Sequence, residues 1–177
     1  MNWYKKAQQL YRGDTESIDI SDFDSEHGTK NLRKELGSSL AQGPGIYFST
    51  QENDAALYGE HITKKQLSGA NILTKNSPLF TYAQIDRMLR QIDKDRVSMA
   101  ISNWDENYSV GKKMLMDSIV GADNPIDQIM GIWTEVFNHQ DPNSFMNLMK
   151  NNGIDGISIV MTPEVTHYII YNRDVLQ

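Results

Sequence analysis

The feature that most constrains the fold is a change of residue pattern along the chain. From residue 81 to about residue 151, isoleucine, leucine, methionine, tryptophan and phenylalanine recur at helical spacing, and Asp-Pro and Asn-Pro pairs punctuate the run. The flanking regions are rich in β-branched and aromatic residues, as in "GIYFS" at 45–49 and "THYIIYN" at 166–172. We therefore expect an α+β fold in which N- and C-terminal strands meet around a helical insertion at about 81–150.

The composition narrows the chemistry and the surroundings of the protein. The chain has 177 residues, which suits one domain with an insertion, and its lack of cysteine excludes thiolate nucleophiles, zinc–thiolate sites and iron–sulfur clusters. A net charge of −6 argues against broad electrostatic capture of nucleic acid. No apolar run approaches the length of a membrane span. We expect a soluble, cytoplasmic protein, although one delivered into a target cell by a dedicated machine would have the same composition.

Short elements are predicted on either side of the helical block. Trp3, Ala7 and Leu10 would share one face of an amphipathic helix, and a second short helix is predicted at 30–40. The segment "LYRGD" at 10–14 predicts a brief strand, and the β-branched residues of 61–74 predict one or two more.

The segment "GPGIYFSTQENDAALYG" at 43–59 predicts a turn, a strand and a capped helix. Its Gly-Pro-Gly start is typical of a turn before a strand. Ser49 with Glu52 three residues later is a capping-box pattern, which predicts a helix that runs through Tyr58 and stops at Gly59.

Several common active-site signatures are missing. The chain has no glycine-rich nucleotide loop, no His-Glu-x-x-His motif and no Gly-x-Ser-x-Gly elbow. Its four histidines lie far apart in the sequence without ligand spacing, so we expect no bound metal.

Three short clusters remain in which a strand carries polar or aromatic groups. They are residues 11–13, residues 45–49 with Tyr58, and residues 167–171. An arginine beside a glycine, as at Arg12-Gly13, suits a phosphate and a close approach of the backbone to a ligand. Tyr47 and Tyr58 are suited to sandwich a flat ring. The clusters together predict a site for a phosphate-bearing aromatic ligand.

The three clusters together resemble the ADP-ribosyltransferase superfamily, which includes bacterial toxins and the poly(ADP-ribose) polymerases. In polymerase-like members a first block carries His-Gly, a second reads Gly-x-Gly-Ile-Tyr-Phe with a later tyrosine, and a third reads Glu-Tyr-Ile-Val-Tyr. Residues 43–48 match the second block without a gap, and Tyr58 falls on the later tyrosine. Residues 11–13 match the first block with arginine in place of histidine, as in the Arg-Ser-Glu branch of the toxins. Residues 167–171 match the third block except at its first position.

The resemblance covers residues 10–80 and 150–177, and "GIDGI" at 153–157 is similar to small phage- and plasmid-borne members. It implies one ADP-ribosyltransferase-like domain over 1–177, with a split β-sheet core and the helical insertion at about 81–150. It also implies that NAD⁺ is the co-substrate and that no metal takes part.

The resemblance assigns roles to individual residues. The backbone of Gly13 would pair with the nicotinamide carboxamide, and Tyr47 and Tyr58 would stack on the nicotinamide ring. Arg12 would brace its strand or reach a phosphate or ribose, and Ser49 would lie next to the bound nucleotide. The residues assigned to NAD⁺ binding are Tyr11, Arg12, Gly13, Gly45, Tyr47, Ser49 and Tyr58, and those assigned to catalysis are Arg12, Tyr47, Glu164 and His167.

His167 is the main departure from the family pattern, because the family places a glutamate there. Cleavage of the nicotinamide–ribose bond creates an oxocarbenium-like centre that a carboxylate stabilises. A neutral imidazole still accepts a hydrogen bond or a proton, whereas a protonated one opposes the developing charge. Glu164 would replace the missing carboxylate only if the turn at Pro163 bends the chain, since residues 164 and 167 of an extended strand face opposite sides.

Each of these residues also has a purely structural interpretation. Arg12 would pair with Asp14 or with an aspartate at 22 or 24. Strand tyrosines such as Tyr47 are commonly half-buried, Glu164 follows a proline in a turn, and a lone histidine is more often structural than catalytic.

The function expected from the resemblance is NAD-dependent transfer of ADP-ribose to a macromolecular acceptor, which is a glycosyltransferase reaction. The acceptor is expected to be a protein, with nucleic acid left open. The first alternative is a catalytically impaired module that binds NAD or ADP-ribose, because His167 stands where the family has glutamate. In a further alternative the helical block is an interaction surface and carries the main activity.

Overall fold

The computed structural model describes residues 7–15 and 43–177. The helix expected at 30–40 and the start of the one expected at 3–10 lie outside these residues. The chain forms two compact units, one made of the residues up to Thr74 together with Pro142–Gln177, and the other of Lys75–Asp141.

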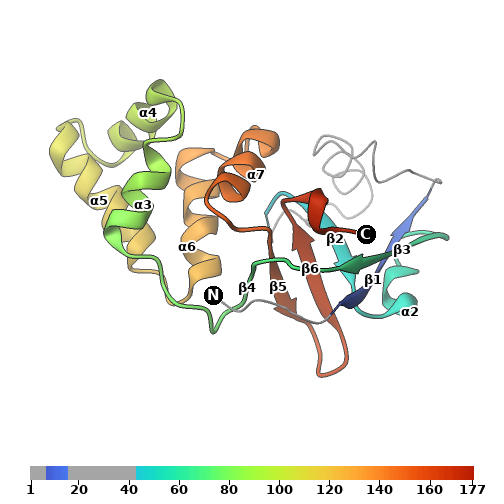
Figure 1. The fold of residues 1–177 in the computed structure, drawn as a ribbon. Helices are drawn as coiled ribbons and strands as arrows, with labels where there is room; N and C mark the ends of the chain where they lie inside the picture. Colours follow the sequence, from blue (N-terminus) through green and yellow to red (C-terminus); the bar gives the residue numbers. More distant parts are fainter. Residues whose placement is uncertain (1–6, 16–42) are drawn as a thin grey trace. The chain divides into compact units, whose positions relative to one another are not determined.

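The first unit contains a six-stranded sheet. Its strands are β1 (Gln8–Asp14), β2 (Ile46–Ser49), β3 (His61–Leu67), β4 (Ile72–Leu73), β5 (Gly156–Val160) and β6 (Thr166–Ile170). The strand order is β3-β1-β2-β6-β5-β4, and only the β4–β5 pair is parallel (Figure 1). Strands from both ends of the chain therefore share one mixed sheet, which confirms the predicted α+β class. Leu10 lies in β1, so the expected extension of an N-terminal helix to this residue is wrong.

The register of the sheet aligns one residue from each of three neighbouring strands. On β1, Tyr11 lies opposite Ser49 of β2, and Ser49 in turn lies opposite His167 of β6. β1 pairs with β3 over its whole length, whereas its register with β2 is given by the Tyr11–Ser49 pair alone among the described residues. The first, second and third sequence clusters thus meet in one row across the sheet.

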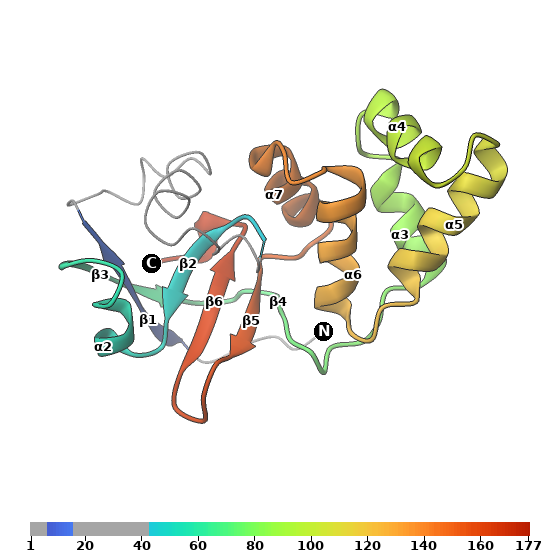
Figure 2. The ribbon, with the colours of Figure 1, turned by 180° about the vertical axis from the view of Figure 1, so that it is seen from behind.

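A short helix, α2 (Glu52–Ala55), covers one face of β1 and β2 (Figure 2). We call this face the α2 face. Gly13 makes the close approach possible, because a Cβ atom at this position would lie 2.0 Å from the carbonyl oxygen of Ala55. Since side chains alternate along a strand, Tyr11 and Ser49 also project to the α2 face, while Leu10 and Phe48 are buried on the other.

The start of α2 differs from the predicted capping box. Its N-cap residue is Gln51, whose side chain makes no capping hydrogen bond, and the helix ends at Ala55, well before Tyr58. The Ser49 hydroxyl instead accepts a hydrogen bond from the backbone N–H of Gln51 at 3.1 Å, which forms a local turn between strand and helix. The Ser49 side chain bonds to the residue two positions ahead, so it stabilises this turn and does not cap the helix. The capping box predicted from Ser49 and Glu52 is therefore wrong.

Helix α7 (Pro142–Asn151) completes the core of the first unit. It buries Phe145 and Met149, and the ring of Phe145 meets the ring of Tyr171 edge-on at 5.9 Å between centroids. The chain then enters β5 through Asp155, whose carboxylate accepts hydrogen bonds from the backbone N–H of Asn71 at 2.8 Å and from the Asn172 side chain at 2.7 Å. The last element, η4 (Arg173–Val175), follows β6.

The second unit is helical, as predicted for this part of the sequence. It contains α3 (Tyr82–Leu89), α4 (Lys94–Trp104), α5 (Tyr108–Val120), α6 (Pro125–Gly131) and the π-helical turn η3 (Ile132–Val136). Its largest fully buried side chain is that of Trp133, which stacks on Phe137 at 5.9 Å between ring centroids. No helix within the described residues is both long enough and apolar enough to cross a membrane.

A buried glutamine connects separate segments of the second unit. Gln128 is fully buried, and its amide group bonds to both backbone groups of Phe80, accepting from the N–H at 2.7 Å and donating to the carbonyl at 3.1 Å. The same amide donates to the carbonyl of Val120 at the end of α5, at 3.1 Å. These bonds supply partners to backbone groups of Phe80 and Val120 in a partly buried region.

Candidate functional site

The candidate site lies on the α2 face, where His167 meets α2. The Nε2 atom of His167 lies 2.8 Å from Oδ2 of Asp54, which belongs to α2. His167 is 9% exposed and the Asp54 side chain is 20% exposed, so the contact is largely shielded from water. Partial burial strengthens a hydrogen bond between an imidazole and a carboxylate, and the two side chains form one unit.

Tyr58 lies against the pair formed by His167 and Asp54. Its ring meets the His167 ring edge-on, with 6.2 Å between the centroids, and 37% of the residue is exposed. Burial, and then the negative charge of Asp54, raise the pKa of the Tyr58 hydroxyl, which keeps it protonated as a hydrogen-bond donor. The site therefore combines an accessible aromatic ring, an imidazole and a carboxylate.

Tyr47 projects to the same α2 face but is held by the turn that precedes β2. Its hydroxyl donates a hydrogen bond to the carbonyl oxygen of Gly43 at 2.5 Å, and burial raises the pKa of this hydroxyl far above its ordinary value. Gly45 has φ of 150°, and a Cβ atom there would lie 2.4 Å from the Ile169 side chain on β6. The turn thus needs glycine at 45, as its sequence predicts, because β2 packs closely on β6.

Arg12 lies on the opposite face of the sheet from Tyr47 and His167, because it follows Tyr11 on β1. Its guanidinium group binds the Asp14 carboxylate through two hydrogen bonds, of 3.0 Å from Nε and 2.7 Å from Nη2. A third bond, of 3.3 Å, runs from Nη1 to the carbonyl oxygen of Tyr47. Arg12 and Asp14 are each only 6% exposed, so the pair braces β1 against β2 from the buried side.

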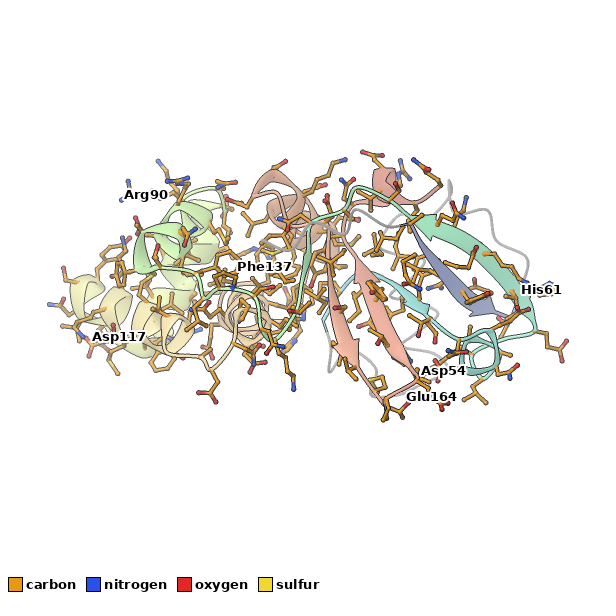
Figure 3. The ribbon with its side chains drawn as sticks, turned by 60° about the horizontal axis from the view of Figure 1, so that its bottom comes forward. Asp54, His61, Arg90, Asp117, Phe137 and Glu164 are labelled. Carbon is orange, nitrogen blue, oxygen red and sulfur yellow. The ribbon has the colours of Figure 1, made fainter. Side chains whose placement is uncertain are left out.

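Glu164 lies in the exposed turn between β5 and β6 (Figure 3). Its backbone carbonyl accepts a hydrogen bond from the Gln51 side chain at 3.2 Å, which connects the turn to the start of α2. The carboxylate that contacts His167 belongs to Asp54 and not to Glu164.

The structure therefore brings together part of the predicted site. Tyr11, Ser49 and His167 form one row on the α2 face, with Tyr58 against His167. Gly13 lies beneath α2, Tyr47 shares the face, and Gly45 shapes the turn before it. Arg12 is directed to the other face and Glu164 to the surface.

Asp54 is the residue that the sequence analysis missed. The available signal was its position four residues before Tyr58, because residues at this spacing on a helical turn face the same side. That signal is weak in so short a helix, and only the fold shows that His167 comes within hydrogen-bond distance.

Within residues 7–15 and 43–177, no group of three histidine, aspartate or glutamate side chains is placed to hold a metal ion. In comparisons with family models, curated proteins and solved structures, nothing matched this chain.

Proposed function

We propose that this protein binds NAD⁺ and transfers its ADP-ribose group to a macromolecule. The observation that supports the proposal is the row formed by Tyr11, Ser49 and His167, which places the three sequence clusters on three neighbouring strands. The clusters lie far apart in the sequence, which by itself does not determine the order of the strands. A shared ligand site is the simplest reason for their joint appearance on one face.

Tyr58 supplies the surface for the nicotinamide ring in this proposal. A partly exposed aromatic ring beside buried polar groups suits a flat, cationic ring, which gains stacking and cation–π energy there. The ribose would then lie over His167 and Asp54, with the Ser49 hydroxyl beside them.

Asp54 compensates for the missing glutamate at position 167. A neutral imidazole bonded to a carboxylate carries one negative charge as a unit, which is the charge of the glutamate that the family pattern has there. Such a charge stabilises the oxocarbenium-like centre that forms when the nicotinamide–ribose bond breaks. The pair therefore favours an active transferase over a module that only binds NAD⁺.

The proposal is tested by incubating the full chain with labelled NAD⁺ and a cell lysate, then counting label on protein and on nucleic acid. We expect label on protein with the wild type and a loss of at least about tenfold with Tyr58→Ala. Tyr108→Ala is the matched control, because Tyr108 is an exposed tyrosine of the helical unit. Binding of NAD⁺ without label on any macromolecule would support the binding module instead.

A further inference from the structure

We propose that Asp54 fixes His167 as a general base, so that the acceptor of ADP-ribose is a neutral hydroxyl group of a protein side chain. This inference rests on the proposed function, which it deepens by naming the acceptor chemistry and a positioning residue. It follows from the direction of one hydrogen bond and from the chemistry of the two ring nitrogens.

The hydrogen bond to Asp54 determines which nitrogen of His167 carries the proton. A carboxylate only accepts hydrogen bonds, so the Nε2 atom that lies 2.8 Å from Asp54 must carry a proton. In the neutral imidazole the other nitrogen, Nδ1, is then unprotonated and basic. Among the residues that the structure describes, none donates a hydrogen bond to Nδ1. This nitrogen is therefore available as a proton acceptor.

The described groups around His167 do not compete with Asp54 for its Nε2 proton. His167 faces Asp54 of α2 and Tyr58 of the segment that follows this helix. Its in-register neighbours on β2 and β5 are the uncharged residues Ser49 and Ile159.

The charged groups near the Tyr11 end of the row, Lys64 and Glu52, are paired with each other. Lys64 lies over the ring of Tyr11 at 5.5 Å and forms an ion pair with Glu52 at 2.9 Å. Within the part of the chain that the structure describes, Asp54 is thus the charged group in contact with the imidazole.

A base of this kind selects the acceptor by its chemistry. A serine or threonine hydroxyl is a weak nucleophile until a base takes its proton. A guanidinium group is cationic, does not lose its proton in proteins, and would gain nothing from a neutral imidazole. The net charge of −6 favours a protein over a polyanionic nucleic acid as the macromolecule that carries the hydroxyl.

The reaction balances without a further reagent. The bond between the ribose C1 atom and the nicotinamide nitrogen breaks, and its electron pair neutralises the cationic ring, which leaves as nicotinamide. The hydroxyl oxygen forms the new bond to C1, and its proton passes to Nδ1 of His167. The resulting imidazolium is stabilised by Asp54 until the proton is released to water, as in other carboxylate–histidine pairs.

The tautomer can be tested on the free protein. Long-range ¹H–¹⁵N spectra at pH 8 should show His167 with a protonated Nε2 and an unprotonated Nδ1, the signal being assigned by its loss in His167→Gln. In Asp54→Ala the preference should disappear. A protonated Nδ1 in the wild type would overturn the proposal, and this result does not depend on NAD⁺.

The acceptor chemistry is tested with two small probes, glycerol for a hydroxyl and agmatine for a guanidinium. With the full chain and NAD⁺, mass spectrometry should detect ADP-ribosyl glycerol above the hydrolysis product and no agmatine adduct. Transfer to agmatine in preference to glycerol, or lysate label found on RNA or on arginine, would overturn the inference while leaving ADP-ribose transfer intact. Absence of NAD⁺ binding would overturn the proposed function and this inference together.

The role of Asp54 is separated from mere folding by kinetics. Asp54→Asn keeps an oxygen that accepts from Nε2 but removes the charge, so kcat should fall by about tenfold with KM changed less than about twofold. Asp117→Asn, at an exposed surface ion pair, is the matched control and should change neither. An Asp54→Asn enzyme with the wild-type kcat would overturn the positioning role.

Discussion

The hydrogen bond between His167 and Asp54 joins the last long strand of the sheet to a helix of four residues, 113 positions earlier in the chain. It places a carboxylate next to an imidazole at the one position where the sequence departs most from the ADP-ribosyltransferase pattern. The pair makes position 167 dependent on position 54, so substitutions at the two sites are expected to be non-additive.

The first prediction is that His167→Glu lowers the stability of the protein when Asp54 is present. The new carboxylate would face Asp54 in a largely shielded site, and one of the two acids would have a raised pKa. An acid whose pKa is higher in the folded than in the unfolded state stabilises the fold at pH values below its unfolded pKa. This contribution is lost as the pH rises through the folded pKa. The melting temperature of His167→Glu relative to wild type should therefore fall between pH 5 and pH 8. The double variant His167→Glu/Asp54→Asn should recover most of the loss, and equal effects of the single and double variants would contradict the pairing.

The second prediction concerns the buried pair of Arg12 and Asp14. Arg12→Met would leave the Asp14 carboxylate buried without a cation, which typically costs about 3–5 kcal/mol in the free energy of unfolding. Urea unfolding measures this loss, and Arg90→Met is the matched control because Arg90 is 76% exposed in its ion pair with Asp86. Arg12→Met/Asp14→Leu should restore much of the stability. An Arg12→Met variant as stable as the control would show that the guanidinium group does not brace the sheet.

The third prediction concerns the helical unit. Gln128→Leu would leave three partly buried backbone groups, two of Phe80 and one of Val120, without their side-chain partner. We expect a loss of about 2–4 kcal/mol in the free energy of unfolding and faster hydrogen exchange at the Phe80 amide. Gln140→Leu, at an exposed position of the same unit, should have a small effect. Unchanged exchange at Phe80 would mean that these bonds do not hold the segment in solution.

The fourth prediction is a pH dependence at Asp86. Hydrogen bonds from Lys112 and then from Arg90 lower the pKa of Asp86, against the opposite effect of its partial burial. Because the folded pKa is depressed, the contribution to stability is present above the unfolded pKa of about 3.9 and is lost as the pH falls through the folded pKa.

Lys112→Gln should reduce the loss of stability caused by protonation of Asp86 between pH 5 and pH 2. The reduction should be less than about 1 kcal/mol, since solvent screens the Lys112–Asp86 pair. Urea unfolding across this range measures it. Lys75→Gln makes the same change in net charge at an exposed position, and a matching response in that variant would attribute the effect to net charge instead.

Much of the fold could be predicted because its strong signals are local. The strands at 46–49 and 166–170 and the helices between 81 and 150 follow from residue periodicity, which depends on neighbours in the sequence. The partner of Arg12 was also accessible, since Asp14 is two residues further along the same strand and shares its face.

The pairing of His167 with Asp54 could not be predicted in this way. It depends on where α2 packs, and that position is set by the absence of a side chain at Gly13, which lets the Ala55 carbonyl approach β1. Such a close approach is a tertiary property that no window of the sequence contains. The partner of the Ser49 hydroxyl could not be predicted either. The hydroxyl could accept from the backbone N–H of Glu52 or of Gln51, and it bonds to that of Gln51.

The most direct test of the central claim is isothermal titration of NAD⁺ into the intact protein, with melting temperature recorded at the same concentrations. We predict saturable heat and a raised melting temperature in the wild type and in Tyr108→Ala, and a marked loss of both in Tyr58→Ala. No heat and no change in melting temperature at millimolar NAD⁺ would contradict the account.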